Sequence, residues 1–460
     1  MKSDYFFDIA RSSDTAPTAI APVFANPATQ VYGTVKASDG NTYEYALWGF
    51  DNQLPYQLKE KVECNSVMSQ DKFFNVLTCY GRGLEYMDLA TRRDKNPLPT
   101  ADKEVVSFLM HNNMKRFFAE QITDLKYYFF CVAVVLLSND RTKIQRIVHK
   151  DACHIRFEKA DEYGRVKHLL FANWKDNDQP DPKNVEAIDL LDEYDPLGDL
   201  MARTGREEDP MHKFSKSSGK KRKFAILCKM PTVGCDYYPV SYWSATLRDG
   251  WFDIYALLTA AKKAKIRNST KIRYHVEINQ EFWDNMARDK GISANTPEFR
   301  TMKDEFITQL RDYLSGSENS DKLIWSEFQS LLDGKERSFI KINVVDVSKA
   351  GNEFNDDVAE ASNVLAYSDN VHPNLAGATP GKSQMNNSGS DKRELFTMKQ
   401  ALETMPHDMM MAVHNTIIFF NDWSDKVYPE VPMIMLTTLD KNKDAEQVST
   451  NNGMSNGNND

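Results

Sequence analysis

The sequence lacks the residue patterns that mark most enzymes and metalloproteins. Its six cysteines include no CxxC pair, and its nine histidines show no HExxH or paired Cys/His spacing, so we expect neither a disulfide framework nor a zinc site. It also has no GxxxxGK[ST] loop and no GxGxxG after a predicted strand. Because those loops bind nucleotide phosphates and dinucleotides, their absence argues against ATP hydrolysis and hydride transfer.

Long apolar segments are absent as well. The most apolar stretch, Tyr127–Leu137, is shorter than the roughly 20 residues that a membrane-spanning helix needs, and its aromatic and β-branched residues favour a buried strand or helix core. The N-terminus has no basic segment followed by an apolar run and a small-residue cleavage site. We therefore expect no secretion signal, no membrane segment and a chain that is made in the cytoplasm.

Positive charge is in deficit. The 57 lysines and arginines are outnumbered by 66 aspartates and glutamates, which gives a formal net charge of −9. A protein whose main role is to hold nucleic-acid phosphates needs clustered cations, so we expect any DNA partner to be held weakly. The basic run at 220–223 is interpreted as a solvated surface.

The remaining candidates for chemistry have simpler structural interpretations. Asp161-Glu162 and Asp192-Glu193 are adjacent acids in polar segments, and neighbouring side chains point apart. Cys153-His154 could supply a nucleophile and a base, but in a strand these side chains face opposite sides of the sheet. Gly81-Arg82-Gly83 is typical of a turn that ends a helix. We therefore predict no catalytic residue, no metal site and no cofactor.

The first half of the chain predicts a mixed α+β region. The 460 residues, 41% of them hydrophobic, suffice for two or three domains. Residues 1–40 are rich in Ala, Pro, Thr and Ser and predict an extended arm. Helical periodicity occurs at 52–89 and 103–126, and strand patterns occur at 143–148, 154–158, 165–171 and 224–229, with a hairpin joining the second and third strands. Residues 175–223 contain four prolines that should break any long element.

Two long amphipathic helices are predicted on either side of an α/β segment at 271–350. The first helix spans 242–267, and its apolar stripe is Leu247, Trp251, Ile254, Leu258 and Ala261. Cations in its last turns should complement the helix dipole; they are Lys262, Lys263, Lys265 and Arg267. The second helix starts near Asn352, and its acidic face comprises Glu353, Asp356, Asp357 and Glu360. Between the two helices, strands are expected at 271–278 and 339–347, and helices at 297–314 and 322–332.

The second long helix is followed by a segment with no periodicity. Residues 371–390 hold two prolines and three glycines and predict a loop of about twenty residues, whereas most connections are far shorter. Asp391 and Glu394 resemble a capping box, and the helix that follows should be kinked at Pro406. A strand is expected at 433–438, before a disordered polar tail at 441–460.

The order of these segments resembles that of the portal proteins of tailed bacteriophages, in which two stem helices bracket a clip and precede a tunnel loop and a kinked helix. Short motifs carry the same resemblance. Trp48-Gly49-Phe50-Asp51-Asn52 with Pro55, and the segment 81–86, are similar to the opening wing segment. Tyr237-Tyr238-Pro239-Val240 is similar to the segment before the first stem helix, and 386–390 resembles the end of a tunnel loop. The short C-terminal region implies a minimal crown.

The resemblance implies an α+β portal fold with an α/β wing, a two-helix stem and an α/β clip. The implied divisions are an N-terminal arm (1–40), wing (41–240), first stem helix (241–270), clip (271–350), second stem helix (351–370), tunnel loop (371–390), kinked helix and wing return (391–440) and tail (441–460). It also implies a non-enzymatic ring, usually a dodecamer, at one capsid vertex of the virion. Such a ring is the channel for packaging and ejecting double-stranded DNA without sequence specificity, and its partners are the major capsid protein, a head-tail adaptor and the terminase motor.

Three groups of residues are the candidate site in this interpretation. The tunnel loop would present Asn374, Lys382, Ser383, Gln384, Asn386 and Asn387 to DNA. The stem would carry the acidic face and the basic end named above. Two alternatives stay open: another capsid-associated adaptor protein, and a metal-dependent nuclease, which is supported only by the abundance of Asp and Glu.

Overall fold

The computed structural model describes residues 30–94, 96–176, 179–206, 221–269, 274–293, 296–315, 328–330, 336–344, 354–376 and 389–434. The chain divides into two compact units. The first combines Met1–Ile254 with Glu360–Asp460, and the second is Tyr255–Ala359. Both ends of the chain therefore belong to one unit, and the other unit is an insertion.

A six-stranded sheet with the order β5-β4-β9-β8-β7-β6 organises the first unit. Its strands are β4 (Phe130–Leu137), β5 (Ile144–Lys150), β6 (Ile155–Phe157), β7 (His168–Phe171), β8 (Glu186–Leu190) and β9 (Lys223–Lys229). Neighbouring strands are antiparallel except β8 and β9, which are parallel. The predicted hairpin is confirmed as β6 and β7. The apolar run before Leu137 forms β4, the strand that lies between β5 and β9 and is buried on both faces.

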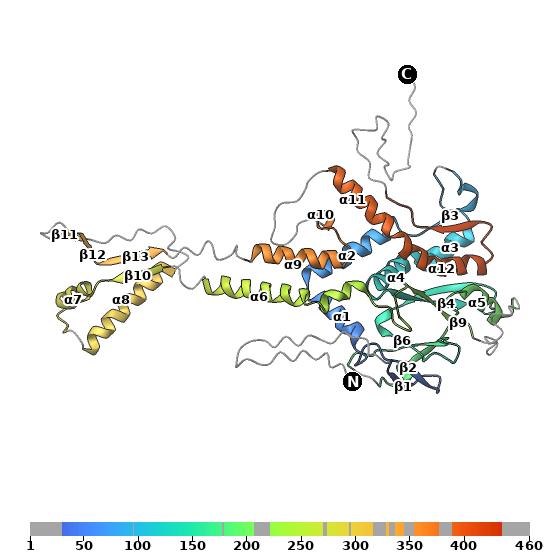
Figure 1. Ribbon diagram of the computed structural model, residues 1–460, viewed down its shortest axis with the longest axis horizontal. Coiled ribbons are helices and arrows are strands. Elements are labelled where there is room, and N and C mark those ends of the chain that lie inside the picture. The colour runs from blue at the N-terminus through green and yellow to red at the C-terminus, as the bar shows by residue number, and fades with distance from the viewer. Residues whose placement is uncertain are drawn as a thin grey trace, which may run out of the picture. The chain divides into compact units, whose positions relative to one another are not determined.

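Helices and two small two-stranded sheets complete the first unit (Figure 1). The helices are α1 (Leu54–Glu63), α2 (Ser66–Tyr80), α3 (Lys103–His111), α4 (Met114–Tyr128), α5 (Pro196–Thr204), α10 (Pro373–Ala376), α11 (Gly389–Leu402) and α12 (Thr404–Phe420). The small sheets pair β1 (Tyr32–Lys36) with β2 (Thr42–Ala46), and β3 (Glu85–Asp88) with β14 (Val427–Glu430). One core contains Phe118 and Ile122 of α4 and Ile417 of α12, and a second core contains Trp48 and Tyr238. Segments that precede the second unit and segments that follow it therefore pack into one folded body.

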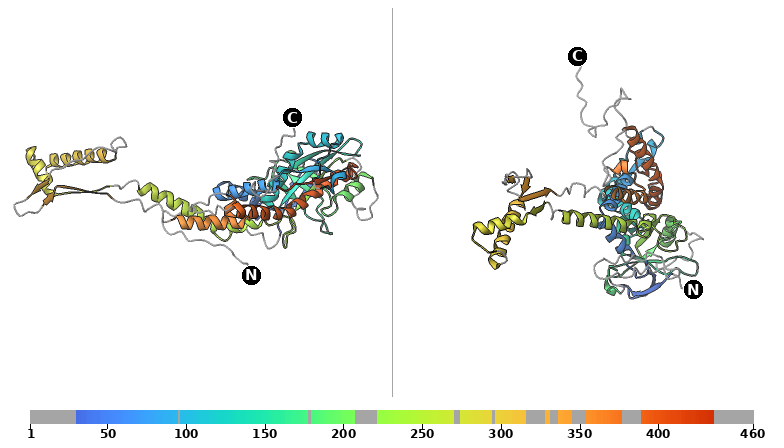
Figure 2. Two further views of the ribbon diagram at one scale, coloured as in Figure 1. Left: turned by 90° about the horizontal axis from the view of Figure 1, so that it is seen from above. Right: turned by 60° about the vertical axis from the view of Figure 1, so that its left-hand side comes forward.

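The second unit has its own small core. Within it, β10 (Tyr274–Ile278) pairs antiparallel with β13 (Ile340–Val344), and β11 (Phe328–Ser330) pairs with β12 (Glu336–Ser338). Its helices are α7 (Gln280–Asp289) and α8 (Pro297–Ser315), shown in yellow tones in Figure 2. Trp283 and Ala287 of α7 pack against Phe299 and Met302 of α8. The α6 (Trp251–Ser269) and α9 (Asn355–Ser368) helices each contain residues of both units.

The predicted helix at 242–267 is two elements. Tyr242–Leu247 forms a 3-10 turn, η5, and α6 begins only at Trp251. Gly250 between them has φ +89°, a conformation that a continuous helix cannot contain. The predicted stripe is also covered only in part, because Ile254 is 40% exposed.

Several predicted boundaries were wrong. The arm ends before residue 40, because β1 pairs with β2 and buries Val35. The segment 175–223, by contrast, contains only short elements among its described residues, as its prolines predict; these include β8 and α5. The side chain of Asp195 caps α5, and Pro196 occupies its first turn, where proline is tolerated. The helix predicted at 322–332 was wrong at 328–330, which form β11, and α7 was not predicted at all. A strand lies at 427–430; of the strand predicted at 433–438, residues 433–434 are irregular and 435–438 lie outside the described residues.

The chain between α9 and α12 also differs from the prediction. Asn374 lies in α10 rather than in a loop, and α11 begins at Gly389, so Asp391 and Glu394 lie inside the helix. The predicted interruption near Pro406 is confirmed, although α11 and α12 separate at Glu403. The cause is the same, because a proline lacks the N–H and crowds the carbonyl four residues earlier, here that of Leu402. No helix within the described residues is long and apolar enough to cross a membrane.

Candidate functional site: a buried charged joint between α2, α4, α9 and α11

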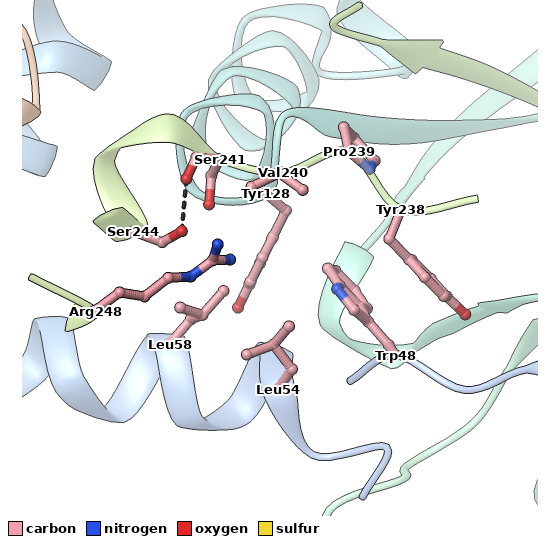
Figure 3. Close-up of a pocket in the computed structure, with 10 residues that line it drawn as sticks. All are labelled: Trp48, Leu54, Leu58, Tyr128, Tyr238, Pro239, Val240, Ser241, Ser244 and Arg248. Atoms are coloured by element: carbon pink, nitrogen blue, oxygen red, sulfur yellow. Dashed lines mark hydrogen bonds between the residues drawn. The ribbon is translucent and has the colours of Figure 1, made fainter. Parts of the chain in front are cut away.

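Two of the motifs quoted from the sequence meet in the first unit (Figure 3). The ring of Trp48 stacks on the ring of Tyr238, with centroids 4.5 Å apart and planes 6° apart. The hydroxyl of Tyr238 donates to the Ala46 carbonyl and accepts from the Phe157 N–H. The backbone N–H of Trp48 donates to Asn52 Oδ1, which also accepts from the fully buried Arg156. These motif residues therefore form part of the second core of the first unit.

A small cavity lies beside this stack. Its lining includes Leu54 and Leu58 of α1, Tyr128 of α4, and the polar side chains of Ser244 and Arg248 (Figure 3). Its volume is about 20 Å³, which is room for roughly one water molecule. It is too small to bind a substrate or a cofactor.

The largest concentration of buried charge lies elsewhere, where α2, α4, α9 and α11 meet. We name this cluster the charged joint; its members are Asp71, Lys72, Lys126, Asp369, Lys399 and Glu403. Among them Lys72 is 1% exposed, Glu403 is 2% exposed and Asp71 is 3% exposed. Ionised groups are so rarely buried that this cluster is the most unusual feature of the first unit.

Lys72 is the central residue of one half of the charged joint, in which it binds Asp369. Its Nζ donates to Asp369 Oδ1 at 2.5 Å, donates to the Lys126 carbonyl and lies 3.9 Å from the ring centre of Trp243. Burial lowers the pKa of Lys72 to about 8, although the carboxylate of Asp369 opposes that shift. Asp369 follows the last residue of α9, an end of a helix at which a negative charge is disfavoured. Lys72 therefore offsets a charge that this position would otherwise exclude.

Glu403 is the central residue of the other half of the charged joint, in which it binds Lys126 and Lys399. Its carboxylate forms ion pairs with Lys126 of α4 and, at 3.3 Å, with Lys399 of α11. Burial opposes ionisation of Glu403, but the two ammonium groups outweigh it and lower the pKa of this carboxyl. Lys399 Nζ also donates to the Asn370 carbonyl. The two halves are thus linked through the turn that ends α9.

The charged joint contains hydrogen-bond acceptors that are not satisfied. Asp71 Oδ2, Asn75 Oδ1 and Asp369 Oδ2 are buried and have no hydrogen-bond partner among the described residues. Asn75 does donate through Nδ2 to the Asp369 carbonyl, at 2.7 Å. Burial, together with the nearby carboxylate of Asp369, raises the pKa of Asp71 to about 7. Buried orphan acceptors are rare in native proteins and need a physical explanation.

A cleft of about 260 Å³ opens beside the charged joint. Its polar lining includes Asn75, Asp369 and Glu403, and its apolar lining includes Tyr242 and Leu402. Tyr242 and Leu402 are each 58% exposed. The cleft therefore gives solvent a route to one side of the ionic cluster.

A second set of titratable groups could be mistaken for a metal site. Asp124, His149 and Asp151 present ligand atoms that all lie within 4.8 Å of one another. However, Nε2 of His149 is 3.0 Å from Asp124 Oδ2 and 3.5 Å from Asp151 Oδ1, and Nδ1 faces the Gln121 amide nitrogen at 2.7 Å. An amide N–H that donates to Nδ1 places the imidazole proton on Nε2, where a metal would have to bind.

The protonation of His149 explains this arrangement. Burial disfavours the charged form, but hydrogen bonds to Asp124 and Asp151 raise the pKa of His149 to about 9. A charged imidazole also carries a proton on Nδ1, which requires the amide of Gln121 to turn. With the amide turned, the Oε1 atom of Gln121, which is buried without a partner in the part of the chain that the structure describes, accepts a hydrogen bond from Nδ1–H. In both states Nε2–H lies between two carboxylates, as in an ion pair.

The structure separates the residues predicted to face DNA. Asp356, Asp357 and Glu360 are exposed on one side of α9, opposite the buried Ala361 and Leu365. Glu353 lies outside the described residues, as do the loop residues Lys382, Ser383, Gln384, Asn386 and Asn387. Only Asn374 of the loop set is placed, in α10. The acidic face is therefore a solvated surface of this chain.

The basic end of α6 does more than complement the helix dipole. Lys262 Nζ donates to Asn355 Oδ1 of α9 at 2.7 Å, and Lys265 Nζ lies 5.5 Å from the ring centre of Phe354. Arg267 stands in the last turn of α6, and Lys263 is exposed. Two of the four cations thus contact the residues at the start of α9, which the sequence analysis did not predict.

The sequence analysis missed the charged joint because charged residues are normally assigned to the surface. One signal existed: Asp71, Lys72 and Asn75 occupy the buried face of α2, where an apolar stripe is expected. Their partners come from distant segments, since Lys72 and Asp369 are 297 residues apart. A single sequence offers no means of pairing them.

No family model matches the sequence, and no curated protein matches it. Solved structures that the chain is similar to include the virion of a native gene transfer agent particle, with a TM-score of 0.49, 13% identity and coverage of 82% of this chain and 83% of that chain. They also include the neck of an empty gene transfer agent particle computed with C6 symmetry, with a TM-score of 0.49, 12% identity and coverage of 82% and 83%. The neck of a native particle computed with C12 symmetry has a TM-score of 0.49, 13% identity and coverage of 80% and 81%.

Proposed function

We propose that this chain is a portal subunit, which assembles with copies of itself into a ring around a channel for double-stranded DNA. The supporting observation is the arrangement of the chain. A separate unit, Tyr255–Ala359, is inserted into the first unit; it begins within α6 and ends within α9, and the chain returns through α11 and α12 to the unit in which it began. In this proposal these parts are the wing, the first stem helix, the clip, the second stem helix and the wing return.

The surface of α6 supports assembly with further copies. Ile254, Leu257 and Ile266 of this helix are each at least 40% exposed. Ile254 and Leu257 are one turn apart on one face of α6, whereas Ile266 lies on the opposite face of the helix. Exposed apolar residues of this kind mark interaction sites when they are grouped, and contacts between two unlike surfaces of identical subunits can close into rings. In this proposal a neighbouring subunit covers α6.

The charge distribution is typical of a channel through which DNA passes rather than of a surface that binds DNA tightly. The exposed acids of α9 and the net charge of −9 would repel phosphates. DNA could then slide past the acidic face, while residues 377–388 supply a few polar contacts and one lysine, Lys382. The inserted unit is proposed to bind the head-tail adaptor and the terminase motor, and the first unit the major capsid protein.

Mass measurement combined with negative-stain imaging of the purified protein tests the proposal. We expect closed rings with a central hole and one dominant subunit number. The double variant Leu257→Glu with Ile266→Glu should shift the population from rings towards monomers. The control is Ile307→Glu, which changes an exposed residue of α8 and should leave the rings intact. A protein that stays monomeric at every concentration would overturn the proposal.

A further inference from the structure

The unsatisfied acceptors of the charged joint lead to an inference about how the end of α9 is held. The turn at 369–371 docks on α2 and α11 through three polar contacts. Lys72 Nζ binds Asp369 Oδ1, Asn75 Nδ2 binds the Asp369 carbonyl, and Lys399 Nζ binds the Asn370 carbonyl. The turn itself closes when the Val371 N–H donates to the Ala366 carbonyl at 2.9 Å. These contacts position the chain just before α10.

The ionic groups of the charged joint are unevenly paired. Three carboxyl groups, those of Asp71, Asp369 and Glu403, face three ammonium groups. Glu403 takes two of these, Lys126 and Lys399, while Asp369 takes Lys72. Asp71 therefore has no ion pair within the charged joint, although it is 3% exposed.

An ionised Asp71 is unfavourable in this position. A buried carboxylate without hydrogen bonds loses its hydration, and the charge of Asp369 adds repulsion that the single ammonium of Lys72 has to offset. A proton on Asp71 removes one negative charge and converts an acceptor into a donor. The neighbouring orphan oxygens, Asn75 Oδ1 and Asp369 Oδ2, are both acceptors, so a donor is what this cluster lacks.

We propose that Asp71 is a proton-dependent latch: its carboxyl group holds a proton while the turn at 369–371 is docked on α2, and loss of that proton favours release of the turn. The titratable groups that act on Asp71 are Lys72 of α2 and Asp369 after α9. Those two groups in turn interact with Lys126 and Tyr127 of α4 and Lys399 of α11, and Glu403 before α12 interacts with Lys126 and Lys399. The latch itself does not depend on the proposed function. Its consequence, control over the loop that starts after α10, does rest on that function.

The pH window follows from the direction of the shift. The pKa of Asp71 is about 7 in the docked state and about 3.9 in an opened, solvated state. The docked state therefore binds one proton more than the opened state between these values. Opening should become about tenfold more favourable for each pH unit gained between pH 5 and about 7, and should level off above that range. Glu403 cannot cause this slope, because its pKa is lowered.

Hydrogen exchange of the purified full-length protein tests the latch. Peptides that contain the Val371 amide should show the tenfold slope between pH 5 and 7, after correction for the intrinsic exchange rate. Asp71→Asn keeps the shape but cannot ionise, so its exchange should lose the slope and stay well protected at pH 8. The control Asp94→Asn changes an exposed carboxyl and should keep the wild-type slope.

Two results would overturn the latch: a wild-type opening constant that does not change with pH, or a slope that persists in Asp71→Asn. If Asp71→Asn does not fold, Asp71→Ser removes the same ionisable group with a smaller side chain and is judged by the same slope. The measurement does not require ring assembly. Failure of the latch is thereby distinguishable from failure of the portal proposal, which imaging decides.

Discussion

Trp48 and Tyr238 stack face to face in the core of the first unit, with ring centroids 4.5 Å apart, and each is less than 10% exposed. Trp48 precedes α1, whereas Tyr238 precedes η5 and α6. The stack therefore fixes the start of the chain's helical region against the segment that leads into α6. Both residues belong to motifs that carried the resemblance to portal proteins, and the structure gives them a packing role.

Trp48→Ala should lower the free energy of unfolding by about 3–5 kcal/mol, because truncation of a buried aromatic side chain leaves a cavity. Phe50, two residues later, is 79% exposed, and Phe50→Ala should change stability by no more than about 0.5 kcal/mol. Urea unfolding followed by circular dichroism measures both variants. Equal losses in the two variants would contradict the assigned role of the stack.

Lys72→Met should lower the free energy of unfolding by about 3–5 kcal/mol, because the partner carboxylate of Asp369 is left buried and unpaired. The double variant Lys72→Met with Asp369→Leu should recover most of that loss, since neither charge then remains. Lys59→Met serves as the control, because Lys59 and Glu63 form an exposed pair at 3.6 Å that contributes little. The same urea titration applies, and a double variant as unstable as the single one would argue against an ion pair.

His149 predicts a pH dependence in the alkaline range. Its pKa is raised to about 9 by Asp124 and Asp151 against the effect of burial, while the unfolded chain has an ordinary value of about 6.5. The charged form thus stabilises the fold fully below about pH 6.5, and this contribution is lost as the pH rises through 9. The charged form of His149 contributes at most about 3 kcal/mol to the free energy of unfolding.

The comparison of His149→Gln with the wild type isolates this contribution. Thermal unfolding between pH 6 and 9.5 should show a smaller decline in the variant. Some decline should remain, because the pKa of His168 is also raised to about 9 by hydrogen bonds to Asp189 and Glu158, which outweigh its burial. Parallel curves for the two proteins would show that His149 is not charged in the fold.

Periodicity and composition predicted much of the secondary structure. The apolar run before Leu137 is β4, the hairpin is β6 and β7, and the interruption near Pro406 separates α11 from α12. These features depend on local sequence, in which the spacing of apolar residues or a missing N–H determines the outcome. The segment 271–350 lies within the unit Tyr255–Ala359, and its assignment as a clip stays a prediction.

The charged joint and the His149 cluster could not be predicted in the same way. Their members are charged residues whose burial depends on partners from distant parts of the chain, as with Lys72 and Asp369 or Lys126 and Glu403. A local pattern assigns each of them to the surface. The division of the predicted helix at 242–267 was missed for another reason. The apolar stripe continues across Gly250, but the positive φ of this glycine ends the helical backbone there.

The acidic face of α9 is predicted to line the channel. Reversing its charges with Asp356→Lys, Asp357→Lys and Glu360→Lys should turn a weakly interacting ring into one that binds duplex DNA with a steep dependence on salt. Filter binding at several salt concentrations measures this. The control reverses three exposed acids of α8, Glu298, Asp304 and Glu305. Equal binding by both triple variants would show that the α9 acids do not face the channel.

Shortening the segment between α10 and α11 is predicted to separate assembly from DNA handling. Replacing residues 378–387 with a short Gly-Ser linker leaves α6, α9 and the core of the first unit unchanged, so rings should form as in the wild type. The segment is proposed to contact DNA in the channel, and loops of this length are usually functional. Particles that carry the shortened chain should therefore package or retain less DNA, as measured by DNA content per purified particle.

A variant of full length with Lys382→Ser separates the effect of length from that of charge, and should lose less DNA because a single weak phosphate contact is removed. If particles with the shortened segment hold the normal amount of DNA, the segment does not form the constriction of the channel.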